Sequence, residues 1–302
     1  MPIWSLVSAV PEGERDPCPA ASVNGRLVTV PPLRGFPDLG DVLADWAALE
    51  PALRRFDPAD GVPLGAARVL APLRSPRKLL FAGANYRDHA REMGIAEISD
   101  DLEPYFFLLP PTTIVGPGDA VVIPGDGDAR VDWEVELAVV IGRPGRDIAI
   151  GDALGHVAGY TIVNDISARG RHARARPLAP PFTYDWLASK GRDTFCPLGP
   201  GVTPSWFVPD PQALPIRLWR GADLEQDGST ADMIFSVARL IAAASEVMTL
   251  EPGDVIATGT PAGVGVAQGK ALADGDVVRA EIGPLGVLEN PVRVASPVPV
   301  TP

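Results

Sequence analysis

The apolar residues of this chain occur in short alternating blocks, which is typical of strands rather than long helices. One block, residues 131–142, reads VDWEVELAVVIG, and another, residues 159–167, reads GYTIVNDIS. Three times a Gly-Asp turn leads into a β-branched run, at residues 118–122, 253–256 and 275–278. Because Gly and Asp favour turns and β-branched residues favour strands, these segments indicate a repeated type of turn that starts a strand.

Helical periodicity is clear in only two segments. Residues 236–249 carry a one-sided apolar stripe, and residues 42–53 show a similar spacing. Asn24-Gly25, between apolar residues, predicts a hairpin. Many strands with few helices predict an α+β, β-rich fold. The Pro-rich segment at residues 71–76 predicts a linker, so we expect a small N-terminal domain at 1–72 and a larger domain at 73–302.

Composition narrows the classes of protein to consider. The 302 residues suffice for one large domain or two, and the net charge of −12 argues against nucleic acid as the main partner. The two cysteines, Cys18 and Cys196, form no C-x-x-C pair, which favours free thiols in a reducing compartment. The N-terminus lacks a basic segment, and the longest apolar segment, residues 233–248, is too short to span a bilayer. We therefore expect a cytoplasmic protein that does not interact with membranes.

Three carboxylates stand in the most apolar parts of the chain. Glu134 and Glu136 are two residues apart, so in a strand they point to the same face, and Asp165 closes a second apolar strand. Glu134 and Glu136 alone could form the wet face of a half-exposed strand, an alternative that Asp165 weakens. If they are buried together, a positive charge must neutralise them. With only three histidines and no cysteine cluster, oxygen ligands favour Mg²⁺, with Mn²⁺ or Ca²⁺ as alternatives, over zinc.

Two further segments carry candidate chemistry. In residues 83–94, Asn85 is expected to cap a short helix that ends at Gly94, with His89 and Glu92 on one face. A histidine oriented by a carboxylate can act as a general base on water, although a surface ion pair is the alternative. In residues 186–200, Lys190 could stabilise a developing enolate or oxyanion, or could simply be solvated.

Two other patterns are less specific. A basic cluster at residues 169–176 could be a solvated loop or lie near an anionic substrate. Residues 258–265, TGTPAGVG, lack the G-K-[ST] ending of a phosphate-binding loop, so we exclude that interpretation.

In this order, the motifs NYRDHAREMG, DWEVELAVVIG, GYTIVNDISAR, SKGRDTFCPLGP, QDGSTADMIFSV and LEPGDVIATGTPAGVG resemble the fumarylacetoacetate hydrolase family. The resemblance covers residues 77–292. It implies a mixed β-roll or sandwich with few helices, preceded by a small N-terminal domain. It also implies a homodimer that binds Mg²⁺ or a similar ion and acts on 2-oxo or 1,3-diketo acids.

The same resemblance implies roles for individual residues. Glu134, Glu136 and Asp165 match the metal ligands, which agrees with the argument from the strands. His89 and Glu92 match a water-activating pair on a lid helix, and Lys190 matches an active-site lysine. The residues expected to line the substrate pocket are Arg169, Gln226 and Thr260.

One position departs from the family pattern. Residues 107–110 read FLLP, whereas the resemblance leads us to expect a lysine where Leu109 stands. The predicted function is metal-dependent hydrolysis of a C–C bond in an acylpyruvate-like 2-oxo or 1,3-diketo acid. The alternatives are an oxaloacetate-type decarboxylase, an isomerase or hydratase of the same family, or, because of Leu109, a non-catalytic binding member.

Overall fold

The computed structural model describes residues 2–99 and 101–296, and these contain one large mixed sheet. Its strands follow the order β3-β2-β1-β13-β11-β10-β16-β5-β6, with β4 added to β1 and β7 to β13. They are β1 (Ser5–Pro11), β2 (Cys18–Val23), β3 (Arg26–Thr29), β4 (Ala67–Leu70), β5 (Leu79–Gly83), β6 (Tyr105–Leu108), β7 (Ile114–Val115), β10 (Val135–Ile141), β11 (Val157–Asn164), β13 (Cys196–Pro204) and β16 (Val255–Ala257).

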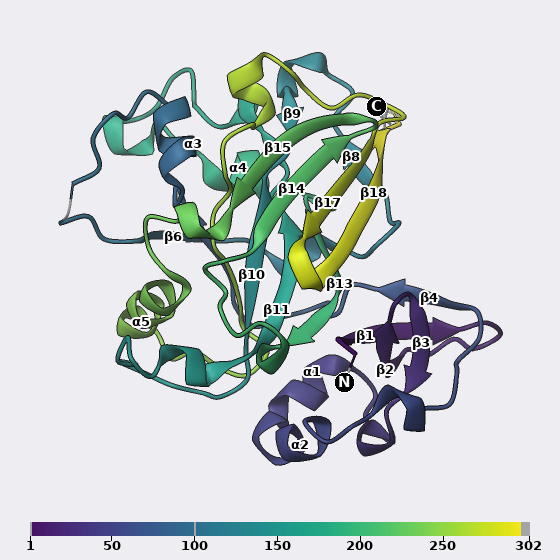
Figure 1. The fold of residues 1–302 in the computed structure, drawn as a ribbon. Helices are drawn as coiled ribbons and strands as arrows, with labels where there is room; N and C mark the ends of the chain where they lie inside the picture. The colour runs from purple at the N-terminus through teal and green to yellow at the C-terminus, as the bar shows by residue number, and fades with distance from the viewer. Residues whose placement is uncertain (1, 100, 297–302) are drawn as a thin grey trace.

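A second, five-stranded sheet lies against the large one (Figure 1). It runs in the order β15 (Asp223–Ser229), β14 (Pro215–Arg220), β17 (Val277–Ile282), β18 (Gly286–Val294) and β8 (Val121–Ile123). A short pair joins β9 (Val131–Asp132) to β12 (Ser167–Ala168). The helices of the described residues are α1 (Leu39–Ala44), α2 (Trp46–Leu53), α3 (Arg87–Glu92), α4 (Trp186–Lys190) and α5 (Val237–Val247). The predicted β-rich α+β fold is confirmed.

Strand β10 separates two apolar cores, because its alternate side chains enter different ones. Val135, Leu137 and Val139 pack with residues of the five-stranded sheet and α5. Ala138 and Val140 pack on the opposite side, with residues from the N-terminal part of the chain. Both faces of β10 are therefore covered, and a carboxylate on this strand cannot simply point into water.

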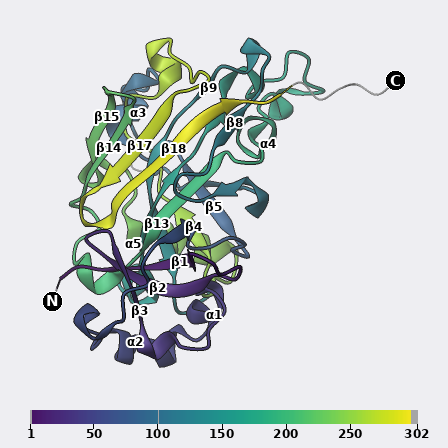
Figure 2. The same cartoon turned by 90° about the vertical axis from the view of Figure 1, so that its right-hand side faces the viewer.

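The N-terminal residues lie together at one end of the molecule (purple in Figures 1 and 2). They join the large sheet where β1 pairs with β13, with Leu6 opposite Val202. Trp4 and Trp46 share the apolar core of Val140. The domain boundary at residue 72 stays a prediction, while this core extends across it.

The prediction of one continuous helix over residues 42–53 is wrong. Asp45, with φ −100° and ψ 17°, interrupts it between α1 and α2. The apolar spacing continues because Leu43 and Trp46 both face the same core. The apolar spacing therefore predicted which face is buried, but it did not predict the break between α1 and α2. No helix of the described residues has the length and apolar character needed to cross a membrane.

The predicted turns are confirmed. Asn24 and Gly25 both have positive φ and join β2 to β3. In the three Gly-Asp turns the glycine has φ between 78° and 86°. Each aspartate accepts a hydrogen bond of 2.7–2.9 Å from the backbone N–H three residues earlier. These N–H and carboxylate pairs are Gly116 with Asp119, Glu251 with Asp254 and Ala273 with Asp276.

Candidate active site

The pairing of β10 with β11 brings the three predicted carboxylates together. Val135 lies opposite Asn164, and the Asp165 N–H donates to the Glu134 carbonyl oxygen over 2.8 Å. Glu134, Glu136 and Asp165 then each offer an oxygen within 4.8 Å of the others. Their exposed fractions are 7%, 2% and 1%, so they do not form the wet face of a strand.

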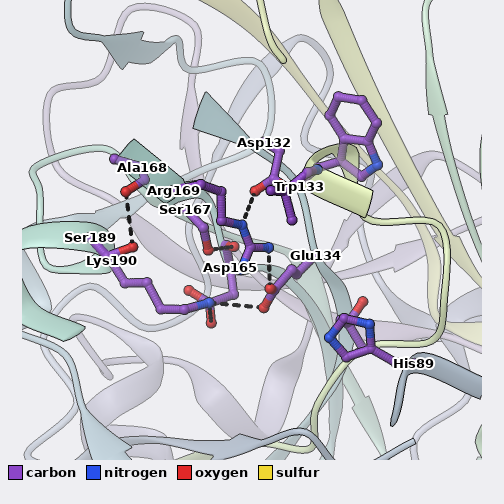
Figure 3. Close-up of polar contacts among 12 residues, drawn as sticks. His89, Asp132, Trp133, Glu134, Asp165, Ser167, Ala168, Arg169, Ser189 and Lys190 are labelled. Atoms are coloured by element: carbon purple, nitrogen blue, oxygen red, sulfur yellow. Dashed lines mark hydrogen bonds and ion pairs between the residues drawn. The ribbon is translucent and has the colours of Figure 1, made fainter. Parts of the chain in front are cut away.

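Two cations, the buried Lys190 and the half-buried Arg169, hold this group of acids (Figure 3). The Lys190 Nζ donates to Asp165 Oδ2 over 2.6 Å and to Glu134 Oε2 over 2.9 Å. The Arg169 guanidinium pairs with the other oxygen of Glu134 and with Asp132, 2.7 Å from Nε. Lys190 is 2% exposed, so it is not a solvated surface lysine.

Asp132 is a site residue that the sequence argument missed. It is fully buried and also accepts a hydrogen bond from the Val266 N–H over 2.8 Å. It lies two residues before Glu134 and four before Glu136, so the alternation that marked those two acids could have marked Asp132 as well. Its partnership with Arg169 orients the guanidinium that contacts Glu134.

The charges of this cluster leave room for a divalent cation. Four buried carboxylates (Asp132, Glu134, Glu136 and Asp165) face two cations, Arg169 and Lys190, so two negative charges are uncompensated when all four are ionised. Asp165 Oδ1 is buried and has no hydrogen-bond partner. A divalent ion with oxygen ligands fits both observations.

The surroundings of these acids shift their pKa values in opposite directions. Burial opposes ionisation of Glu134, but Lys190 and Arg169 outweigh it and lower its pKa to about 2. Burial raises the pKa of Asp165 to about 7. Burial, together with the charges of Asp165 and Glu134, raises the pKa of Glu136 well above its ordinary range. Without a bound cation, protons on Asp165 and Glu136 neutralise part of the buried negative charge.

The segment 258–265 supplies a backbone hydrogen-bond donor to the site. The Gly259 N–H donates to Glu136 Oε2 over 2.7 Å. Gly259 has φ +88°, and a Cβ there would meet the Cβ of Asn85 at 2.8 Å. Only glycine fits this position without a shift of its neighbours.

Gln226 and Thr260 lie beside this segment and are bonded to each other. Gln226 Nε2 donates to Thr260 Oγ1 over 2.8 Å, and Gln226 Oε1 accepts from the Val135 N–H over 3.0 Å. Both are buried. They support the start of β10, and a direct substrate contact by either stays a prediction.

His89 and Glu92 lie on α3, and His89 is beside Glu134 in Figure 3. His89 Nδ1 is 2.8 Å from Glu92 Oε2. Because a carboxylate only accepts, Nδ1 carries the proton and Nε2 is left as the basic nitrogen. Glu92 Oε1 accepts from the Gly263 N–H over 2.9 Å, and His89 is 7% exposed, so this is not a surface ion pair.

The predicted cap of this helix is wrong, whereas its predicted end is confirmed. Asn85 does not cap α3; its side chain bonds Phe235 and the Thr258 carbonyl, which lie 150 and 173 residues further along the chain. Gly94, with φ +84°, follows the end of the helix. Asn85 thereby joins the start of α3 to the segment that carries Gly259.

A family model, the C-terminal region of fumarylacetoacetate hydrolase, matches residues 78–293. The chain belongs to the fumarylacetoacetate hydrolase family. An oxaloacetate tautomerase of Xenopus laevis, named as mitochondrial, is 43% identical over 74% of this chain and 68% of its own. The oxaloacetate tautomerase of Bacillus subtilis is 41% identical over 76% of this chain and 74% of its own.

Solved structures of the family agree with this fold. A maleylpyruvate hydrolase of Sphingobium, in complex with manganese(II) and pyruvate, is 30% identical. It superposes with a TM-score of 0.77, covering 97% of this chain and all of its own. These three relatives are enzymes named for oxaloacetate and maleylpyruvate. The acidic cluster here is of a kind that holds a divalent metal.

Leu109 is buried in the second apolar core. It is 3% exposed and belongs to the same apolar core as Ala138, which shares its face of β10 with Glu136. Cys196, also buried in this core, has its pKa raised by burial and by the nearby charges of Asp165 and Glu136. The position where the family resemblance leads us to expect a lysine is therefore packed in an apolar core.

Proposed function

We propose that this protein is a divalent-cation-dependent hydrolase that cleaves a C–C bond of an acylpyruvate-like 2-oxo or 1,3-diketo acid. Water and the substrate give pyruvate and a carboxylic acid. The observation that carries this proposal is the His89–Glu92 pair, 2.8 Å apart and beside Glu134. An oriented histidine next to a cation site is the arrangement needed to activate water.

Glu134, Glu136 and Asp165 would hold the cation, with Mg²⁺ as the proposed ion and Mn²⁺ or Ca²⁺ as alternatives. When bound, it would supply positive charge that polarises the 2-oxo acid group. The oxygen ligands and the uncompensated negative charge support this assignment.

His89 Nε2 would accept a proton from water, which attacks the distal carbonyl carbon. Glu92 keeps the proton on Nδ1 and is itself fixed by the Gly263 N–H. The bond between that carbon and C3 of the pyruvate part breaks, and its electron pair leaves as an enolate. The Lys190 ammonium adds positive charge beside the place where that charge develops. The enolate then takes a proton and becomes pyruvate.

A keto–enol tautomerase is the second candidate, favoured by the relatives that are 41–43% identical. It would use the same base, with His89 removing a proton from carbon instead of from water. Decarboxylation needs neither proton transfer to His89 nor an attacking water.

The test is turnover by the His89→Ala variant, followed by NMR with acetylpyruvate and with oxaloacetate in the presence of Mg²⁺ or Mn²⁺. We expect wild-type protein to release pyruvate and acetate, and the variant to lose roughly 10²–10⁴-fold in rate. His156→Ala is the matched control, because the His156 ring bonds the Arg143 carbonyl oxygen and lies outside the acidic cluster. A near-normal rate for His89→Ala would exclude His89 as the base.

The products separate the candidates. Release of acetate from acetylpyruvate supports hydrolysis, whereas exchange of the C3 protons of oxaloacetate for deuterium without loss of carbon supports tautomerisation. Formation of CO₂ that survives in His89→Ala supports decarboxylation. Tight binding of every substrate without any of these reactions would support a non-catalytic member.

The assembly and the compartment are also proposals. We infer a homodimer, as the family resemblance implies, and light scattering of the purified protein would measure its mass. A cytoplasmic location stays a prediction.

A further inference from the structure

A row of five aromatic rings, which we call the aromatic row, lies beside the acidic cluster. Its members are Tyr105, Phe107, His172, Tyr184 and Trp186. Phe107 stacks on Trp186 with 4.9 Å between centroids, and His172 meets Trp186 edge-on at 4.5 Å. Tyr105 contacts Trp186 at 5.8 Å, and Tyr184 contacts His172 at 5.1 Å. The rings come from β6, from the segment after β12, and from the start of α4.

The aromatic row begins at the site and ends in solvent. The Lys190 Nζ, which bonds Asp165, lies 5.7 Å from the Phe107 centroid and 6.0 Å from that of Trp186. At the other end, Tyr105 is 52% and Tyr184 63% exposed. A substrate held at the acids and extending outward would therefore pass along aromatic faces.

Three of the four arginines at residues 169–176 have carboxylate partners. Arg169 pairs with Asp132 and Glu134, Arg171 with Asp126, and Arg174 with Asp185. The basic cluster at residues 169–176 is thus largely neutralised by the protein's own carboxylates. A second carboxylate on the substrate would have to compete with these pairs.

Two further side chains, His172 in the aromatic row and Leu109, carry no charge. Burial and the nearby charges of Arg169 and Lys190 lower the pKa of His172, so its ring is neutral at pH 7. Leu109 is packed in the apolar core behind Phe107. Apolar and aromatic groups gain by stacking on such a surface, whereas an unpaired carboxylate loses its hydration there.

We propose that the aromatic row receives the acyl substituent of the substrate, and that this substituent is apolar or aromatic and carries no second carboxylate. The proposal rests on the function proposed above and specifies its substrate class as monocarboxylic aroyl- or alkenoylpyruvates. Trp186, at the centre of the row, is then a specificity-determining residue.

The test measures binding separately from turnover. The Mn²⁺-loaded His89→Ala variant, which is expected not to consume substrate, is titrated calorimetrically with benzoylpyruvate, acetylpyruvate and succinylpyruvate. We expect benzoylpyruvate to bind most tightly and succinylpyruvate, with its second carboxylate, most weakly. Adding Trp186→Ala should weaken benzoylpyruvate roughly 5- to 10-fold relative to acetylpyruvate, because stacking on the indole is lost.

A matched control is Phe182→Ala, on the same segment and 55% exposed but outside the aromatic row. It should leave all three affinities unchanged. Tighter binding of succinylpyruvate than of benzoylpyruvate, or an unchanged ratio in Trp186→Ala, would overturn the proposal. If Trp186→Ala instead changes only the mass of the assembly, the row belongs to a contact between copies and the proposal is wrong.

Failure of the proposed hydrolysis would give a different result from failure of the proposed substrate class. If the predicted order of affinities is found but wild-type protein cleaves no acylpyruvate, hydrolysis is wrong and the substrate class stands. If none of the three ligands binds the metal-loaded protein, both proposals fall.

Discussion

Single residues in the acidic cluster make the stability of the metal-free protein depend on pH. Burial raises the pKa of Asp165 from its ordinary value of 3.8 to about 7, and Glu136 shifts in the same direction. Between pH 3.8 and about pH 7 the folded state binds more protons than the unfolded chain. The free energy of unfolding therefore falls as the pH rises through this range. Glu134 has the opposite sign, but its contribution is lost only as pH falls from 4.5 towards 2.

We therefore expect a divalent cation to stabilise the protein more at about pH 8 than at about pH 5, because at the higher pH it replaces protons that are no longer present. Melting temperatures with and without Mn²⁺ at the two pH values would measure this. Asp165→Asn is the comparison variant, and it should show a smaller pH dependence and a smaller effect of Mn²⁺. An equal effect of Mn²⁺ at both pH values would contradict the assignment of the cation site.

The sequence predicted the acids of this site because alternation along one strand is a local property. Their partners were harder to predict. The contact of the Gly259 N–H with Glu136 joins residues 123 apart and depends on the packing of a whole loop. Similarly, the alternation could have marked Asp132, but it could not predict that Arg169 lies between Asp132 and Glu134 and pairs with both.

Among the elements, the Gly-Asp turns were predictable because glycine and aspartate favour them wherever they occur. The contribution of each turn to stability was not predictable, because it depends on where the following strand lies in its sheet. Asp254 precedes β16, which lies between β10 and β5 in the large sheet, and it is fully buried. Asp119 makes the same type of turn before β8, but its side chain is 41% exposed.

Replacing Asp254 with alanine should lower the free energy of unfolding by about 2–4 kcal/mol, because the Lys78 and Glu251 backbone N–H groups lose their acceptor and the Lys78 ammonium loses a partner. Asp119→Ala, the matched change in an exposed turn, should cost less than about 1 kcal/mol. Urea denaturation of the two variants measures both values. Equal losses would show that turn chemistry alone, and not the position of the strand, sets the cost.

For the molecule as a whole, the main unknown from sequence was how the first 72 residues meet the rest. The Pro-rich segment predicted a boundary, and chain composition cannot reveal that one apolar core extends across it. Trp46 from α2 stacks on Trp206 at 6.0 Å between centroids, and Trp4 meets Phe207 at 5.6 Å. The two parts thus pack aromatic side chains against each other.

Because the apolar core is shared, we expect the two parts to unfold together. Trp46→Ala should lower the free energy of unfolding by about 3–5 kcal/mol, since Trp46 is 1% exposed and its loss leaves a cavity against Trp206. Val62→Ala, in the same part of the chain but 66% exposed, should change it by less than about 0.5 kcal/mol. Calorimetry measures both, and in Trp46→Ala the protein should still show a single transition at a lower temperature. Two separated transitions in the wild-type protein would mean that the N-terminal residues fold independently, despite the packing between the tryptophans.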